Sequence, residues 1–294
     1  MSNYIQKPET IGKNIWYRAS FPSLNALYNY LKSNPTINER VYKKRVSLDR
    51  EEFYLGDPLE NAIEYLKGGY YEEYEDFLHL KGELDSKVYF TPPPLAFKRT
   101  QAGSRIDTMA VLAGSHNFMI KPVSNKPDKF VNVYFNLAHS EKSSSTQIRN
   151  RGLITLNLIK LLESNNYNVK LEAFSLCYLK NEFEYIKLNL KEHGKKLNTE
   201  LCYFPFVAKE FYRRIIFNVK ETLPVENIEW ERSYGLVLGY DEIKKTLNLG
   251  EKDILINLPL EMGIKGGLEK KDLIEDANSM FNVIGIDKYV KIKK

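Results

Sequence analysis

The sequence predicts an α/β protein in which a smaller, mainly helical N-terminal region precedes a doubly wound, mostly parallel sheet. From residue 129 onward, short runs rich in Val, Ile, Phe and Tyr alternate with segments of helical pattern, the order that builds a parallel sheet. The first hundred residues show mainly helical spacing. Between the two regions, Pro92–Pro94 forces an extended segment that suits a linker. We therefore expect a helical region at residues 1–100 and an α/β domain at residues 101–294.

Three helices are expected in the first region. Ser23 can cap a helix over Leu24–Leu31, whose apolar residues recur at helical spacing. Asp57 can cap a second helix, which begins with a proline and ends at a pair of glycines. A third helix is expected at Tyr71–Leu80, with its acidic residues turned to solvent.

The second region begins with a glycine-punctuated stretch over residues 101–116, which we expect to be irregular. Strands are expected at Phe130–Phe135, Val169–Tyr178, Glu200–Phe206 and Asp253–Pro259. Helices are expected at Leu153–Leu162, Phe183–His193 and Tyr240–Leu247. The segment Lys209–Val219 favours a helix, with a strand as the alternative.

Composition is that of a folded protein. The chain has 294 residues, 43% of them apolar and 28% charged, which predicts one large or two unequal domains. The net charge of +5 is too small an excess to require a nucleic-acid partner. The two cysteines form no metal-binding spacing, and no apolar run reaches the roughly 20 residues of a membrane span. We expect no membrane association, no cofactor and a reducing cytosol.

The loop after the first strand of the sheet is the first place to look for a site, because ligands of open α/β sheets bind beyond the carboxyl ends of the strands. It reads Asn136-Leu137-Ala138-His139-Ser140 and leads through a serine-rich turn into a long apolar helix. Over residues 130–259 this order resembles the von Willebrand factor A family. In that family Asp-x-Ser-x-Ser stands at the loop and holds a divalent metal that grips an acidic partner.

The loop departs from the family's metal-binding motif at two of its three ligand positions. Asn136 replaces the aspartate and removes the charge, and Ala138 replaces the first serine and removes an oxygen. Only Ser140 matches, whereas hard divalent cations need several oxygen ligands. The resemblance therefore implies a degenerate site, and we expect a metal-free scaffold.

The chain as a whole resembles a family of uncharacterised proteins encoded by bacteriophages and plasmids. The shared features are a Gly56-Asp57-Pro58 turn before an amphipathic helix, Arg105-x-Asp107, Leu112-Ala113-Gly114, and Asn150-Arg151-Gly152 on the long helix. The resemblance implies a mobile-element origin, in the host cytoplasm or on the virion, and brings no established activity.

Two arginines and two histidines are further candidates for a binding site. Arg149 and Arg151, near the serine-rich turn, could hold a phosphate or carboxylate through their forked donors. In the alternative, one of them pairs with a carboxylate such as Asp107 and the other is solvated. His116 and His139 could meet in space, although no two histidines have metal-ligand spacing.

Three functions follow as hypotheses, and protein binding is preferred because the sequence has no complete catalytic motif. The first is a non-enzymatic protein-binding or assembly module that engages its partner at the strand-end loops. The second is nucleic-acid binding, for which basic residues with aromatic neighbours are the signal. The third is an enzyme with an unrecognised site. The candidate residues are Asn136, His139, Ser140, Arg105, Asp107, His116, Arg149 and Arg151.

Overall fold

A mixed β-sheet forms the body of the protein. A computed structural model describes residues 4–34, 56–71, 74–90, 97–122, 130–139, 143–225, 236–250, 253–257 and 290–292. Within these residues the main sheet has seven strands. They are β1 (Glu9–Ile11), β2 (Asn14–Phe21), β7 (Phe130–Asn136), β8 (Asn168–Leu179), β9 (Glu182–Lys191), β10 (Leu236–Val237) and β11 (Asp253–Ile256).

The order of the sheet is β1-β2-β9-β8-β7-β11, with β10 paired to β8 outside this path. β7 runs parallel to both β8 and β11, and β2 runs parallel to β9. β8 and β9 form an antiparallel hairpin, so the sheet contains two parallel groups of opposite direction. This arrangement confirms the α/β class with a mixed sheet of mostly parallel strands.

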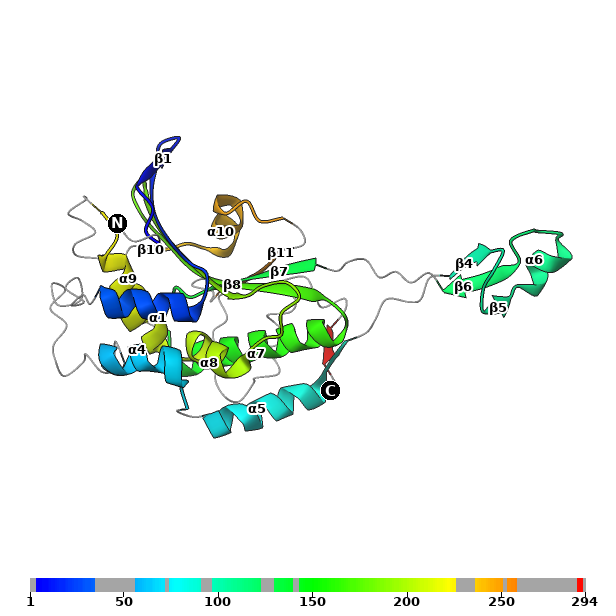
Figure 1. Cartoon of the computed structure of the whole chain (residues 1–294), viewed down its shortest axis with the longest axis horizontal. Coiled ribbons are helices and arrows are strands. Elements are labelled where there is room, and N and C mark those ends of the chain that lie inside the picture. Colours follow the sequence, from blue (N-terminus) through cyan, green and yellow to red (C-terminus); the bar gives the residue numbers. More distant parts are fainter. Residues whose placement is uncertain are drawn as a thin grey trace.

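Most of the helices cover one face of this sheet. Figure 1 shows α1, α4, α7 and α8 on one side and α10 on the other. The helices of the body are α1 (Leu24–Ser33), α4 (Leu59–Gly68), α5 (Tyr74–Lys87), α7 (Ser145–Ser164), α8 (Thr199–Val207), the π-helix η1 (Phe211–Ile216), α9 (Phe217–Glu221) and α10 (Tyr240–Thr246).

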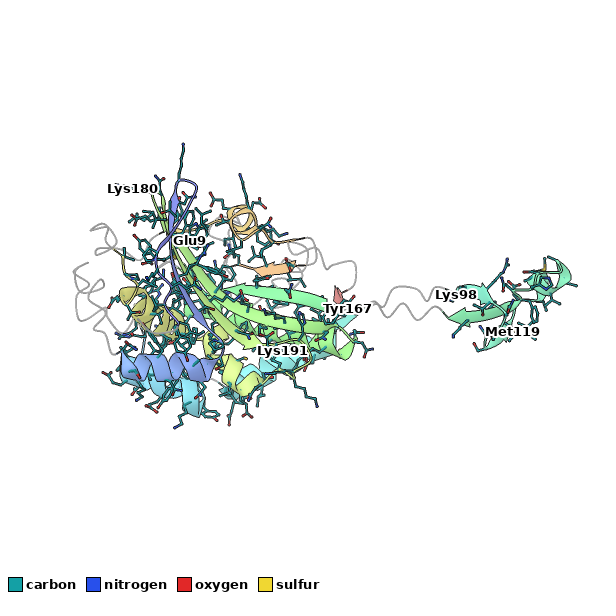
Figure 2. All side chains as sticks on the ribbon, turned by 45° about the horizontal axis from the view of Figure 1, so that its top comes forward. Glu9, Lys98, Met119, Tyr167, Lys180 and Lys191 are labelled. Carbon is teal, nitrogen blue, oxygen red and sulfur yellow. The ribbon has the colours of Figure 1, made fainter. Side chains whose placement is uncertain are left out.

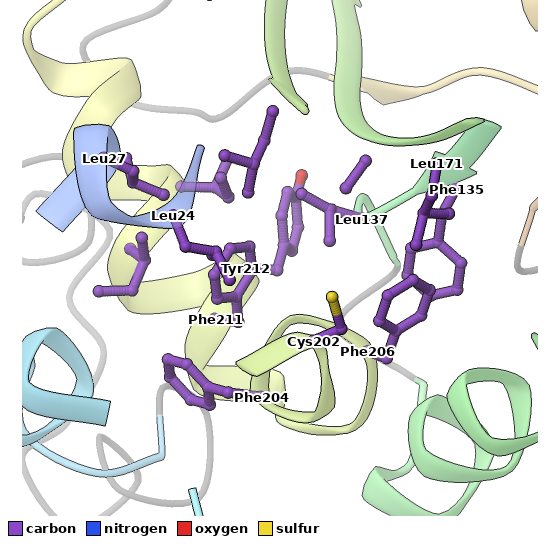
Figure 3. Packing of buried hydrophobic residues seen from close by; sticks show 14 of the residues in the cluster. Leu24, Leu27, Phe135, Leu137, Leu171, Cys202, Phe204, Phe206, Phe211 and Tyr212 are labelled. Atoms are coloured by element: carbon purple, nitrogen blue, oxygen red, sulfur yellow. The ribbon is translucent and has the colours of Figure 1, made fainter. Parts of the chain in front are cut away.

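The main core lies between the sheet and the larger helical layer (Figure 3). Phe135 of β7 packs on Phe206 of α8, with ring centroids 4.2 Å apart. Gly152 lets α7 approach α8 closely, since a Cβ there would lie 2.4 Å from the Phe206 carbonyl oxygen. On the opposite face, Trp16 and Phe174 belong to a smaller cluster that includes Ile243 of α10.

The expected long helix after the first strand is confirmed as α7. Ser144 caps it, and its hydroxyl oxygen accepts a hydrogen bond from the Gln147 amide (3.1 Å) while the Gln147 side chain accepts one from the Ser144 amide (2.9 Å). This reciprocal capping box explains why the helix starts in the serine-rich turn. The helix stops at Asn165, as its asparagine pair predicts.

The N-terminal region differs from the expected helical one, because it contributes strands to the main sheet. β2 pairs with β9 in register from Ile15 opposite Glu182 to Phe21 opposite Leu188. The sequence of β2, NIWYRASF, is rich in β-formers, and its pairing places β1 and β2 in the same sheet as strands of the second region. The three expected helices are present as α1, α4 and α5, although Pro58 rather than Asp57 occupies the cap of α4.

Two other elements were predicted wrongly. The expected helix Phe183–His193 is the strand β9, whose buried residues Glu184, Ile186 and Leu188 alternate with less buried ones. The expected strand Glu200–Phe206 is the helix α8, which Asn198 caps by accepting a hydrogen bond from the Leu201 amide (3.1 Å). The helical reading of Lys209–Val219 is confirmed, as are the helix at Tyr240 and the strand at Asp253.

Residues 97–122, which include the stretch 101–116 that was expected to be irregular, form a small folded unit, here called the 97–122 unit. It contains β4 (Phe97–Thr100), β5 (Arg105–Ile106), α6 (Thr108–Leu112) and β6 (Met119–Pro122), with the strands in the order β4-β6-β5. Figure 1 shows it apart from the main sheet. A further two-stranded sheet pairs β3 (Val88–Phe90) with β12 (Val290–Ile292). The proline segment at 91–94 lies outside the described residues.

Candidate binding sites

The loop after β7 is closed by its own hydrogen bonds. Asn136 is fully buried, and its side-chain amide donates to the Asn257 side-chain oxygen (2.8 Å). Its Oδ1 accepts a hydrogen bond from the amide of Ala138 (3.1 Å). Both ends of the Asn136 side chain therefore hold the backbone and the end of β11 in place. Ser140 lies outside the described residues.

Arg151 supports this loop from α7. Its guanidinium lies 4.5 Å above the Phe135 ring, and its Nη1 donates to the Asn136 carbonyl oxygen (2.8 Å). Only 2% of the residue is exposed, and burial lowers the pKa of Arg151 to about 9. Arg151 thus fixes the end of β7 on α7, which is a structural role.

His139 lies in the core beside Tyr212. Their ring centroids are 4.9 Å apart, and the Tyr212 hydroxyl lies 3.5 Å from the Cys177 sulfur. Burial is the main cause that raises the pKa of Tyr212 far above its ordinary value. With these side chains enclosed in the core, we assign the pair to packing between β7, β8 and η1.

A buried ion pair next to this group was not foreseen from the sequence. Lys220 Nζ lies 3.5 Å from Glu184 Oε2, and both side chains are fully buried. Lys220 Nζ also lies 5.6 Å from the centroid of the Tyr212 ring. Glu184 occupies an inward position of β9, between apolar residues, so strand alternation could have indicated a buried acid.

The remaining candidates lie in the 97–122 unit. Asp107 caps α6 by accepting a hydrogen bond from the Ala110 amide (3.2 Å), and it pairs with Arg99 Nε (2.7 Å). Arg99 therefore takes the partner that we had considered for Arg149 or Arg151. The hydrogen bond from Arg99 lowers the pKa of Asp107.

The structure does not assemble the expected enzyme site from these residues. Arg105 and His116 are exposed in the 97–122 unit, whereas Asn136 and His139 are buried in the body. His116 and His139, which could have met in space, likewise lie in these two separate parts of the structure. Across the described ranges, no group of three or more His, Cys, Asp or Glu side chains could hold a metal ion.

The 97–122 unit carries several exposed apolar side chains, which together we call the apolar tip. Its side chains are Ile106, Met109, Val111, Leu112 and Phe118, with exposed fractions of 61, 71, 47, 82 and 37%. Ala110 is the buried residue of the unit among those described. Exposed apolar side chains gathered on so small a unit are typical of an interaction surface.

The strands of the 97–122 unit carry most of its basic side chains. Lys98 and Lys121 stand directly opposite each other on β4 and β6, and like charges in this position are destabilising. Ile120 of β6 lies opposite Arg99 of β4 on one side and opposite Arg105 of β5 on the other. Figure 2 labels Lys98 and Met119 on this unit. The four basic residues outnumber Asp107, so the unit carries a net positive charge.

The Gly56-Asp57-Pro58 turn is held against η1. Arg214 donates from Nε to the Asp57 carbonyl oxygen (2.8 Å) and from Nη2 to that of Gly56 (3.1 Å). Gly56 has a φ of +75°, and a Cβ there would lie 1.9 Å from Glu210 Oε1. The Asp57 carboxylate accepts a hydrogen bond from the Tyr65 hydroxyl (2.6 Å). The glycine is therefore required by both backbone conformation and space.

These features define an α/β protein with a mixed sheet, a buried strand-end loop and a small basic unit with an apolar tip. The chain belongs to the family described as domain of unknown function DUF7192, whose model matches residues 9–287. No curated protein and no solved structure matches the chain. In the part of the chain that the structure describes, no helix is long and apolar enough to cross a membrane.

Proposed function

We propose that the protein is a non-enzymatic protein-binding or assembly module, and that the 97–122 unit makes the contact. The observation that carries this proposal is the apolar tip. Full burial of one large aliphatic side chain is worth about 1.5–3 kcal/mol. Covering Met109 and Leu112, which are 71 and 82% exposed, would supply much of the free energy that a specific contact needs. The contact surface differs from the strand-end loop expected from the sequence.

The von Willebrand A-like arrangement and the mobile-element origin are further parts of this proposal. Two observations support the von Willebrand A-like arrangement: β7 lies between β8 and β11 and runs parallel to both, and a serine-rich turn connects its end to α7. In such a scaffold the loop that normally holds metal would be closed by Asn136. The partner would then be bound elsewhere, on the 97–122 unit.

Capture of partners with a tip variant tests the proposal. Tagged wild-type protein, the double variant Met109→Ser/Leu112→Ser and the control Leu236→Ser are used to capture proteins from the native source. Leu236 is 58% exposed on the body, so the control also replaces an exposed apolar side chain by serine but leaves the apolar tip unchanged. We expect a set of proteins that the wild type and the control retain and the double variant loses. Equal capture by all three proteins, or no capture at all alongside turnover of a nucleotide or nucleic acid, would refute it.

Nucleic-acid binding is the second candidate, because Lys98 and Lys121 face each other and Arg105 is exposed beside them. Fluorescence anisotropy with a labelled single-stranded or duplex oligonucleotide tests it. Electrostatic binding of this kind weakens steeply as salt rises. Absence of binding at low salt would remove this candidate and leave the protein-binding proposal intact.

A further inference from the structure

A small cavity lies between the first turns of α7, the end of α8 and the start of η1. It has a volume of about 140 Å³. Drug-sized ligands occupy roughly 300–1,000 Å³, while a single water needs about 10–15 Å³ measured in this way. The cavity therefore suits a small ion or one polar head group. We call it the α7–η1 cavity.

Positive charge predominates among the side chains that line the α7–η1 cavity. Arg149 comes from α7 and Lys209 from the segment between α8 and η1, and Arg149 is only 8% exposed. A guanidinium offers five donors in a fork that matches the oxygens of a phosphate or carboxylate. Tyr70 and Ser145 add hydroxyl groups to the same lining.

Glu210 is the acidic residue in this lining, and its carboxyl group also contacts the Gly56–Asp57 turn. Its Oε1 packs against Gly56, so closely that a Cβ on that glycine would lie 1.9 Å away. Burial raises the pKa of Glu210, which disfavours its charged form. The Glu210 carboxyl thus packs on the Gly56–Asp57 turn and also interacts with the charge of Lys209, so the lining holds two cations to one acid.

We propose that the α7–η1 cavity binds a small oxyanion, either free or as the phosphate or carboxylate group of a larger molecule. Arg149 and Lys209 supply the charge, and the cavity's size limits the ligand to one such group. The site lies in the body of the protein, so its binding does not depend on the apolar tip. This assigns to Arg149 the anion-binding role that its position after the serine-rich turn suggests, and not to Arg151, whose guanidinium binds the Asn136 carbonyl.

Isothermal titration calorimetry on the full chain tests the proposal, with sodium phosphate, sodium acetate and O-phosphoserine as the probes. We expect phosphate or acetate to bind at millimolar concentration or below. O-phosphoserine distinguishes the source: binding at least as tight as that of phosphate indicates a head group on a larger molecule, whereas no binding indicates a free ion. All titrations are repeated with the Met109→Ser/Leu112→Ser variant, which we expect to bind like the wild type.

Two variants and one control locate the binding. Arg149→Gln and Lys209→Gln should each weaken it at least tenfold. Lys209 is only partly buried, so we expect the Lys209→Gln variant to fold and to test the site even if the Arg149→Gln variant does not fold. Lys196→Gln removes an exposed lysine from a neighbouring open pocket and should bind like the wild type. No heat with any of the three probes at about 10 mM, roughly ten times a millimolar Kd, or unchanged binding by Lys209→Gln, would overturn the proposal.

Discussion

Replacing Lys220 by methionine should destabilise the protein strongly, because it removes the cation that lies against the buried Glu184 carboxyl. The two charged atoms are 3.5 Å apart and both side chains are fully buried. At an effective dielectric constant of about 20, unit charges at this distance attract by roughly 5 kcal/mol. Removal of one partner from a buried pair costs about 3–5 kcal/mol in measured cases. We expect a loss in this range for Lys220→Met.

Urea unfolding, followed by circular dichroism, measures this loss as a change in the free energy of unfolding. The double variant Lys220→Met/Glu184→Leu should recover much of it, since an apolar pair of similar volume often replaces a buried ion pair without cost. Lys32→Met is the control, because Lys32 pairs with Glu64 on the surface and should change little. A loss below about 1 kcal/mol for Lys220→Met, or a double variant no more stable than the single one, would refute the reasoning.

Three further predictions concern packing, a cap and a thiol. Gly152→Ala should lower the free energy of unfolding by about 1–3 kcal/mol, because the added methyl group would overpack α7 against α8. Gly82→Ala has open space around it and should raise the free energy of unfolding by up to about 1 kcal/mol. Urea unfolding measures both changes, and equal effects would contradict this reasoning. The pKa of Asp107 is lowered from 3.8 mainly by Arg99, so the stability that this group gives the 97–122 unit is present above pH 3.8 and is lost as the pH falls through the lower folded value. Carboxyl NMR titration of Asp107 should show this, with the midpoint returning upward in Arg99→Gln. Burial raises the pKa of Cys202 to about 12, so iodoacetamide at pH 8 should leave it unmodified in native protein and modify it in urea; rapid native labelling would show that it is accessible.

Local sequence signals predicted much of the α/β layout because they have short-range physical causes. Ser144 and Gln147 satisfy each other's backbone groups at the start of α7, and this can be read from four consecutive residues. α8 was mistaken for a strand because nearly all of its apolar residues are buried, and a segment buried on all sides shows no period. In β9 the alternation was present, but Phe183 and Tyr185 pack on the opposite face of the sheet, which masked it.

The candidate site was harder to predict, because it depends on contacts between distant segments. That Asn136 would bond to Asn257, 121 positions along the chain, follows only from the parallel pairing of β7 with β11. The place of Arg149 in the lining of a cavity depends on how α8 and η1 meet, which no local pattern records. The loop after β7 was correctly identified as the end of the first strand, whereas its role as a closed structural element required the neighbouring strand.

The pairing of β2 with β9 has a consequence for how the chain is made. β2 cannot pair with β9 until Glu182, which lies opposite Ile15, has been synthesised. At about 5–20 residues per second, translation of the two residues is separated by roughly 8–35 s. During that interval β2 has β1 on one side, but its other edge lacks β9 and is available to chaperones or to other nascent chains. An early strand of the main sheet must therefore stay on the ribosome without its parallel neighbour until the hairpin that contains β9 has been made.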